Sequence, residues 1–231
     1  MRAPEKKAVE FDMSGVSVMI AIPVNRDLPW QTAQSLVETI VELKDRGIDF
    51  DVQFVVGSSI VEMARTKVAH AFLKSNKTRL FMIDSDQSWK AKDFIRLLAL
   101  STKMHVVCGA YPAKREPPTF LLAPEDGDAC SNEFGCVPIK GIGLGFTVVH
   151  RYVIAELAWK AELVKFPGED SPVAHIFRCD VVDGDFRGED MAFFADVRAL
   201  GHKVYLDPSI QIGHIGGKEY RADIMKVMQQ V

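Results

Sequence analysis

The sequence predicts an α/β fold with a mostly parallel central sheet, helices on both faces and a less regular C-terminal half. Residues 16–24 and 79–83 form nearly unbroken apolar runs, as strands buried on both faces do. Segments with helical spacing of apolar residues alternate with these runs through short connections. Such alternation is typical of a parallel sheet, which binds ligands beyond the carboxyl ends of its strands.

The first half of the chain alternates regularly. Its predicted strands are residues 16–24, 50–56, 79–83 and 106–110. Its predicted helices are residues 31–47, 59–73 and 91–100. Ser59 and Glu62 have the spacing of a capping box, which predicts where the second helix begins.

The second half begins with a loop over residues 111–138 that is rich in proline, glycine and acidic residues, and we expect it to be mobile. Its predicted strands are residues 120–122, 141–150 and 203–206. Its predicted helices are residues 151–160 and 188–200.

Composition excludes several classes of protein. The chain has 231 residues, 48% of them hydrophobic and 26% charged, which excludes collagen-like, disordered and coiled-coil proteins. A net charge of −3 is not that of a dedicated nucleic-acid binder. No apolar run reaches the ~18 residues of a membrane helix, and residues 1–12 lack a secretory signal. We expect one cytoplasmic domain, residues 1–231, without a membrane span.

Four cysteines lack any CxxC spacing. Cys130 and Cys136 lie six residues apart in a loop-like stretch, so a zinc site with His175 or His214 is one interpretation. Free thiols in a reducing compartment are the other, and the one that the spacing favours.

Two carboxylates follow the predicted strand 79–83 directly. Asp84 and Asp86 flank Ser85, and on an extended segment side chains two residues apart project to the same side. Two close carboxylates repel each other unless a positive group lies between them, and Mg²⁺ or Mn²⁺ meets that need. The alternative is a polar turn after a strand.

Arg65 lies on the apolar stripe of the predicted helix 59–73, which turns its guanidinium inward. A buried guanidinium requires an anion, either Asp84 or Asp86 or the phosphate of a ligand. Asp190 shares the inward face of helix 188–200 with two phenylalanines, so its pKa is expected to be raised, as suits a general base. Glu189 is expected to point sideways, where the helix dipole alone would favour it.

Three further segments contain candidate residues. His214 lies between glycines after a predicted strand, and its imidazole could complete a metal site begun by Asp84 and Asp86, although a lone histidine is more often structural. Gly143 belongs to GIGLG at residues 141–145, which lacks dinucleotide-fingerprint spacing and indicates close approach of a ligand or backbone. Residues 110–115 contain an aromatic and two basic side chains, and form either a phosphate or acceptor contact or a solvated turn.

The order of these motifs resembles a known family. The chain has IPV in its first strand, Ala64-Arg65 in a helix, FMIDSDQSW, CGAYPAK, a GxG-bearing strand, GED at a helix start and a late His-Gly loop. This set resembles the GT-A fold glycosyltransferases of the family-2-like type, particularly compact bacteriophage and bacterial versions. The resemblance covers about residues 16–218, with a nucleotide-sugar half over residues 16–115 and an acceptor half over residues 116–218.

The resemblance implies a role for each candidate residue. Asp84, Asp86 and His214 would hold Mn²⁺ or Mg²⁺ on the diphosphate of a nucleotide sugar, with a UDP-sugar favoured. Asp190, with Glu189 beside it, would deprotonate an acceptor hydroxyl in an inverting transfer. The residues implied to surround the donor nucleotide are Pro23, Val24, Arg65, Asp84, Ser85 and Gly143.

The chain departs from the compact relatives at Thr66, where they often have asparagine. The resemblance allows a glycan, a protein or a modified base of phage DNA as acceptor, the last implying a host cytoplasm. Retaining transfer, the sugar and the oligomeric state stay open. The alternatives are a non-catalytic sugar-nucleotide-binding protein, or a nucleotidyltransferase, although residues 22–26 lack the glycine-rich loop that the latter needs.

Overall fold

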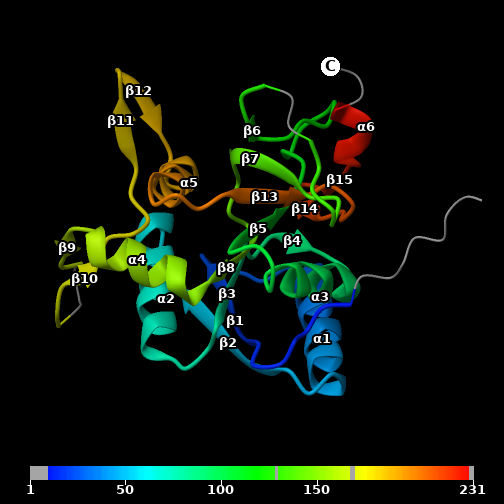
Figure 1. The fold of residues 1–231 in the computed structure, drawn as a ribbon, viewed down its shortest axis with the longest axis horizontal. Coiled ribbons are helices and arrows are strands. Elements are labelled where there is room, and N and C mark those ends of the chain that lie inside the picture. The colour runs from blue at the N-terminus through cyan, green and yellow to red at the C-terminus, as the bar shows by residue number, and fades with distance from the viewer. Residues whose placement is uncertain (1–9, 128–129, 167–169, 229–231) are drawn as a thin grey trace, which may run out of the picture.

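A computed structural model describes residues 10–127, 130–166 and 170–228 and contains a central eight-stranded sheet (Figure 1). Its strand order is β2-β1-β3-β8-β5-β13-β7-β6. The pairings give six strands one direction, while β8 and β7 run the opposite way. The fold is therefore α/β with a mostly parallel sheet, as predicted.

The strands of this sheet, in spatial order, are β2 (Asp49–Val56), β1 (Ser17–Val24), β3 (Arg79–Ile83), β8 (Phe146–His150), β5 (Val106–Gly109), β13 (Val204–Asp207), β7 (Val137–Ile142) and β6 (Leu122–Pro124). The helices are α1 (Trp30–Asp45), α2 (Val61–Lys74), α3 (Ala91–Leu100), α4 (Arg151–Lys160), α5 (Glu189–Ala199) and α6 (Ile224–Met228).

The sheet separates two apolar cores because alternate residues of its strands point to opposite faces. In β3, Phe81 packs into one core and Leu80 into the other. The core containing Phe81 also takes apolar side chains from α1 and α3, and the core containing Leu80 takes them from α2, α4 and α5. Figure 1 shows α1 and α3 together at the lower right, and α2 and α4 at the left.

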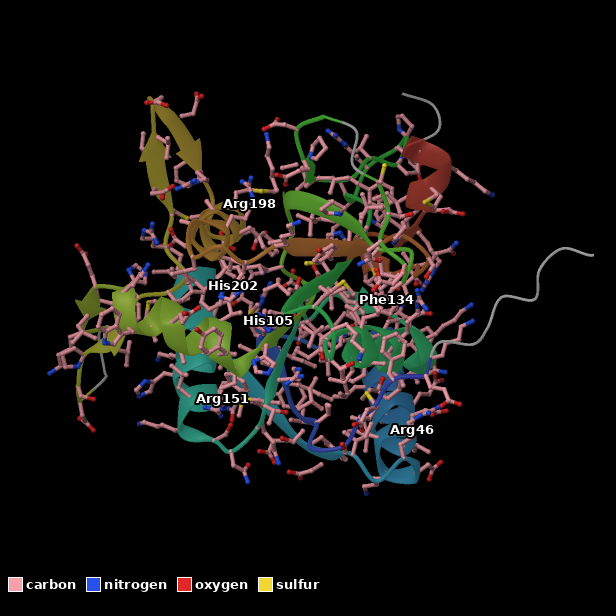
Figure 2. The ribbon with its side chains drawn as sticks, viewed as in Figure 1. Arg46, His105, Phe134, Arg151, Arg198 and His202 are labelled. Atoms are coloured by element: carbon pink, nitrogen blue, oxygen red, sulfur yellow. The ribbon has the colours of Figure 1, made fainter. Side chains whose placement is uncertain are left out.

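Arg151, labelled in Figure 2, joins α4 to the end of α2. Its guanidinium donates to the carbonyl oxygens of Phe72 and Ser75, each at 2.7 Å, and lies over the ring of Phe72, 4.6 Å from the centroid. These bonds add to the capping of the C-terminal end of α2, where the Phe72 carbonyl also accepts the backbone N–H of Ser75 at 3.1 Å. The contact fixes α2, and with it Arg65, against the rest of this face.

Among the described residues, three small sheets lie outside the central one. They pair β9 (Leu163–Val164) with β10 (Val173–Ala174), β11 (Asp180–Val182) with β12 (Asp185–Arg187), and β14 (Gly213–Ile215) with both β15 (Glu219–Arg221) and β4 (Gln87–Ser88). The third sheet matters for the site because β4 directly follows Asp86 and β14 contains His214. Pairing of these strands brings the late histidine to the end of β3.

Two local predictions were wrong. Residues 141–150 form the end of β7, a turn and β8 instead of one strand, and both strands are antiparallel to their neighbours. The capping box does not form either, because α2 begins after Ile60 with no side-chain cap, and Glu62 instead accepts the backbone N–H of Cys179 at 2.8 Å. The capping box fails because the carboxylate of Glu62 is already bonded to Cys179, far along the chain.

The short predicted strand at residues 120–122 lies slightly later, at β6. Among the helices of the described residues, none has both the length and the apolar character needed to cross a membrane.

Phe81 provides a test of the sheet core. Its ring stacks on Phe94 at 4.1 Å and meets Phe146 edge-on at 4.9 Å between centroids. Phe81→Ala is expected to lower the free energy of unfolding by about 3–5 kcal/mol, measured by urea denaturation, because it leaves a cavity between two packed rings. The control Phe186→Ala removes a ring that is 74% exposed, and it should change the free energy of unfolding by less than about 0.5 kcal/mol. Equal losses in both variants would contradict this account of the core.

Candidate active site

Arg65 joins three carboxylates that come from distant parts of the chain. Its side chain is only 4% exposed. Nη2 donates to Asp84 Oδ1 at 2.9 Å, and Nη1 donates to Glu189 Oε1 at 2.8 Å and to Asp190 Oδ1. The guanidinium faces inward as predicted and pairs with Asp84, one of the anions that the sequence offered, and the cluster joins residues up to 125 positions apart in sequence.

The segment after β3 differs from the prediction. Residues 85–86 form a turn and not an extended segment, so the carboxylates of Asp84 and Asp86 meet different partners. Asp84 bonds to Arg65, whereas Asp86 bonds to Lys114 and lies 3.5 Å from Nε2 of His214. The carbonyl of Ser85 accepts the hydroxyl of Thr32 at 2.9 Å, which ties the turn to α1. The predicted extended segment is therefore wrong, and the polar turn that the sequence offered as the alternative is what forms.

Glu189 and Asp190 occupy the first turn of α5, after Gly188. Both side chains reach Nη1 of Arg65, and Glu189 is only 16% exposed. The prediction that Asp190 faces inward is confirmed, but the prediction that Glu189 points sideways is wrong. Attraction to a buried cation turns Glu189 into the site, which the position of a residue on a helical wheel does not reveal.

Tyr111 lies between Asp84, which is bonded to Arg65, and His214, which faces Asp86. Its hydroxyl donates to Asp84 Oδ2 at 3.4 Å and accepts the backbone N–H of Gly145 at 3.3 Å, and its ring meets that of His214 edge-on at 5.1 Å between centroids. A Cβ at residue 143 would overlap the Tyr111 hydroxyl, and one at residue 145 would overlap Asp84. Glycine at both positions thus lets these side chains lie against the backbone.

The charges of the site and its burial shift the pKa values of its groups in opposite directions. Burial raises the pKa of Asp190 to about 6, and the negative charges of Glu189 and Asp84 add to this while Arg65 opposes it. Burial would also raise the pKa of Asp86, but hydrogen bonds from His214 and Lys114 hold it at about 2. Burial, then Asp84 and Asp190, raise the pKa of the Tyr111 hydroxyl well above its usual range. Asp190 is therefore the carboxylate suited to take up a proton near neutral pH.

Asp86 and His214 are two of the predicted metal ligands, and the structure brings them together. Nδ1 of His214 lies 2.9 Å from the carbonyl oxygen of Pro112 and donates to it, which leaves Nε2 as the ring nitrogen that faces Asp86. Lys114 places a positive charge on the same carboxylate. An imidazole and a carboxylate are ligand types that Mn²⁺ accepts, but the Lys114 ammonium on Asp86 competes with a metal ion for that carboxylate.

Asp84 is bonded to Arg65 and Tyr111, so the three predicted ligands do not converge. Within the described ranges, no group of three or more histidine, cysteine or acidic side chains is arranged to hold a metal ion. The cysteine–zinc interpretation gains no support in the described residues, where no such group forms around Cys130 and Cys136 and the latter is buried.

Pro23 and Val24 end β1 beside β3, so they lie at the same edge of the sheet as Asp84. Val24 is buried, and its carbonyl accepts the N–H of Gly57 at 2.9 Å. The placement agrees with a role at the site, which stays a prediction for both residues.

Gln87 is a residue of the site that we did not identify from the sequence. It is fully buried beside residue 145, and neither its amide nitrogen nor its amide oxygen has a hydrogen-bond partner. Nε of Arg65 is also buried without a partner. Unsatisfied buried polar atoms of this kind require a water or a ligand group. Gln87 directly follows Asp86, and that adjacency is the sequence signal that could have identified it.

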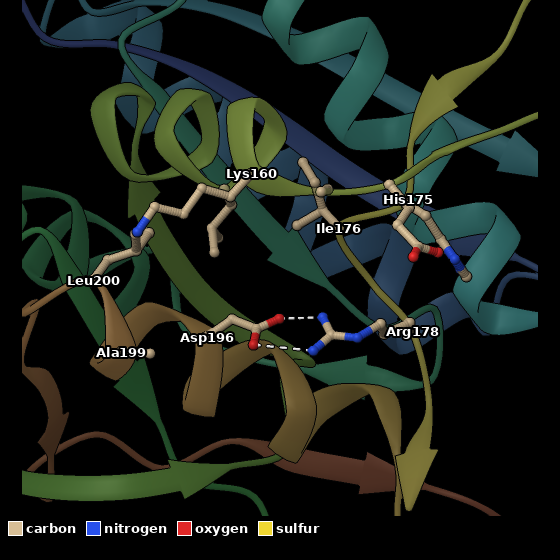
Figure 3. A pocket seen from close by; sticks show the side chains of 10 residues that line it. Lys160, His175, Ile176, Arg178, Asp196, Ala199 and Leu200 are labelled. Carbon is tan, nitrogen blue, oxygen red and sulfur yellow. Dashed lines mark hydrogen bonds and ion pairs between the residues drawn. The ribbon is translucent and has the colours of Figure 1, made fainter.

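A separate cavity of about 390 Å³ lies between α4, α5 and the segment at residues 175–178 that follows β10 (Figure 3). Arg178 crosses it to form an ion pair with Asp196, while Lys160 and His175 line its sides. The cavity borders the C-terminal half of α5, whereas Asp190 lies in the first turn of that helix. It is thus distinct from the carboxylate–arginine site, and no sequence pattern indicated it.

Comparisons with known proteins support the fold. No protein-family model and no curated protein matches the chain. Among solved structures, it is similar to A197 from STIV, with a TM-score of 0.56, 19% identity, and coverage of 87% of this chain and 86% of that one. It is also similar to GalNAc-T7, solved with UDP, GalNAc and Mn²⁺, with a TM-score of 0.55, 13% identity and coverage of 90% of this chain.

The chain spans only 44% of the GalNAc-T7 chain. A third structure is 4-diphosphocytidyl-2C-methyl-D-erythritolsynthase from Anaerococcus prevotii DSM 20548, with 11% identity over 65% of this chain and 79% of that one. Its TM-score of 0.33 is too low to support a shared fold. At these identities the likeness concerns the fold alone. The chain has a GT-A-like fold.

Arg65 is expected to hold the site together. Arg65→Met should lower the free energy of unfolding by about 3–5 kcal/mol at pH 7, because it leaves buried carboxylates without their cation. The control Arg46→Met removes an exposed pair with Glu42 and should cost less than about 1 kcal/mol. Chemical denaturation measures both values. A loss of less than about 1 kcal/mol at Arg65 would contradict the assignment.

Proposed function

We propose that this chain is a metal-dependent glycosyltransferase that moves a sugar from a nucleotide-diphosphate sugar, a UDP-sugar by preference, to an acceptor hydroxyl. The observation that carries the proposal is the cluster on Arg65. It brings a strand-end aspartate, Asp84, together with Asp190, a carboxylate whose pKa is raised to about 6. A leaving-group site and a base must face one crevice for such a transfer.

The proposed roles follow from the contacts. Asp190 accepts the proton of the acceptor hydroxyl as that oxygen forms its bond to the anomeric carbon. The bond between the anomeric carbon and the diphosphate oxygen breaks, and the nucleoside diphosphate leaves with the electron pair. Attack opposite the leaving group inverts the anomeric centre. Arg65 positions Asp190, and Lys114 supplies positive charge close to the diphosphate.

A divalent cation would neutralise charge on the departing diphosphate. Asp86 and His214 would hold it, and Asp84 would join them once donor binding loosens its bond to Arg65. The GalNAc-T7 structure contains UDP and Mn²⁺ on a similar fold, and this supports the donor and metal classes by analogy. The other proposed donor contacts are Pro23, Val24, Ser85, Gln87 and Gly143.

A non-catalytic sugar-nucleotide-binding protein is the second candidate. One observation favours it: Arg65 already bonds to Asp190, so the base is engaged before any acceptor arrives. Such a protein would bind the nucleotide with metal but would neither transfer the sugar nor hydrolyse the donor.

Nucleotide binding should depend on a divalent cation. We expect UDP to bind more tightly with Mn²⁺ than with a chelator, and Asp86→Asn and His214→Ala each to lower the Mn²⁺-dependent affinity at least ~10-fold, since each removes a ligand. Isothermal titration measures this. The control Asp126→Asn, in an exposed pair with Lys140, should bind like the wild type. Binding that is indifferent to chelator would contradict the metal role.

Transfer should depend on pH through Asp190. A base works when it is unprotonated, so kcat/KM should rise with pH through about 6 and level off above it. Asp190→Asn should reduce transfer at least ~100-fold at pH 7 while UDP binding is kept, whereas Glu189→Gln should keep the acidic limb but move it to lower pH, because a like charge beside Asp190 is removed. Full activity in Asp190→Asn would contradict the assignment. Nucleotide binding without any turnover in the wild type would favour the non-catalytic candidate.

A further inference from the structure

Three histidines lie together at one end of the central strands of the sheet. The candidate active site lies at the other end of these strands. His105 directly precedes β5 and His202 lies just before β13, while His150 ends β8, which runs the other way. Figure 2 labels His105 and His202, which lie close together beside the sheet. Tyr111 follows the far end of β5, so this histidine group and the carboxylate–arginine site occupy opposite ends of the same strand.

His105 and His202 face each other through matching ring nitrogens. Their Nδ1 atoms are 3.3 Å apart. Nε2 of His202 donates to Glu156 Oε2 at 2.7 Å, so in the neutral ring Nδ1 carries a lone pair directed at His105. A carboxylate bonded to the distal nitrogen of an imidazole is the arrangement that orients histidine ligands of metals.

The separation of the two Nδ1 atoms suits a shared metal ion. Zinc binds imidazole nitrogen at about 2.0–2.1 Å, so two such ligands at a tetrahedral ion lie about 3.3–3.4 Å apart. Imidazole ligands also suit Ni²⁺ and Cu²⁺. We propose that His105 and His202 bind a divalent transition-metal cation of the zinc class through their Nδ1 atoms, with Glu156 as the positioning residue.

His150 does not supply a third ligand. Its Nδ1 accepts the backbone N–H of Tyr152 at 3.1 Å, which places the proton of the neutral ring on Nε2. The site therefore has two protein ligands, in agreement with the lack of any three-residue metal group in the described part of the chain, and water completes the coordination.

The charges around the pair keep the imidazoles available. Burial, His202 and Arg79 lower the pKa of His105, which favours the unprotonated, ligating form at neutral pH. Arg79 also opposes a cation, but its guanidinium donates to Ser101 and to the Thr78 carbonyl, and Glu156 supplies a negative charge on the other side of His202.

The test is titration of the nucleotide-free, full-length protein with ZnCl₂ in competition with a coloured zinc indicator. We expect one zinc ion per chain. His105→Ala and His202→Ala should each lower the affinity at least ~10-fold, and Glu156→Gln about 10–100-fold. The controls His70→Ala, on α2, and His214→Ala, at the candidate active site, should bind zinc at the high-affinity site like the wild type.

Two-bond ¹H–¹⁵N spectra of the wild type test the proposal without any substitution that could disturb the fold. Zinc should shift the Nδ1 resonances of His105 and His202 and leave the proton on Nε2 of each ring, whereas His150 should change little. Unshifted Nδ1 resonances, or zinc affinity lost in His214→Ala but kept in His105→Ala, would overturn the proposal and leave the two rings as a simple hydrogen-bonded pair.

Discussion

The candidate active site depends on the neutralisation of one buried positive charge. A guanidinium that is 4% exposed cannot stay charged without anions, and Arg65 obtains three of them. Asp84 comes from the end of β3, and Glu189 and Asp190 come from the start of α5. Because these elements belong to the two halves of the chain, the requirement of Arg65 for anions fixes how the halves meet at the carboxyl edge of the sheet.

Part of this arrangement was predictable from local pattern. Unbroken apolar runs located β1 and β3, and helical spacing located the inward positions of Arg65 and Asp190. Spacing does not encode strand direction or long-range attraction, so the antiparallel β8 and the inward Glu189 were missed, and the turn at residues 85–86 stood only as the alternative to an extended segment. The pairing of His105 with His202 was also beyond reach, because it depends on the order of β5, β8 and β13 across the sheet.

The groups at the two ends of the central strands are chemically different. At the carboxyl edge, acidic side chains and a tyrosine surround Arg65, and glycines at residues 143 and 145 allow their close approach to the backbone. At the opposite edge, two imidazoles face each other beside Glu156. Oxygen ligands favour Mg²⁺ or Mn²⁺, and imidazole nitrogens favour zinc and its neighbours. The two proposed cation sites thus lie at opposite ends of β5.

The most direct measurement of the central claim is the pKa of the Asp190 carboxyl, followed by carbon-13 NMR in the wild type and in Asp84→Asn. The account predicts a value near 6 in the wild type. It predicts a lower value in Asp84→Asn, because a like charge is removed and Arg65 becomes more available to Asp190. An ordinary Asp190 pKa in the wild type, unchanged in Asp84→Asn, would contradict a shared site built on Arg65.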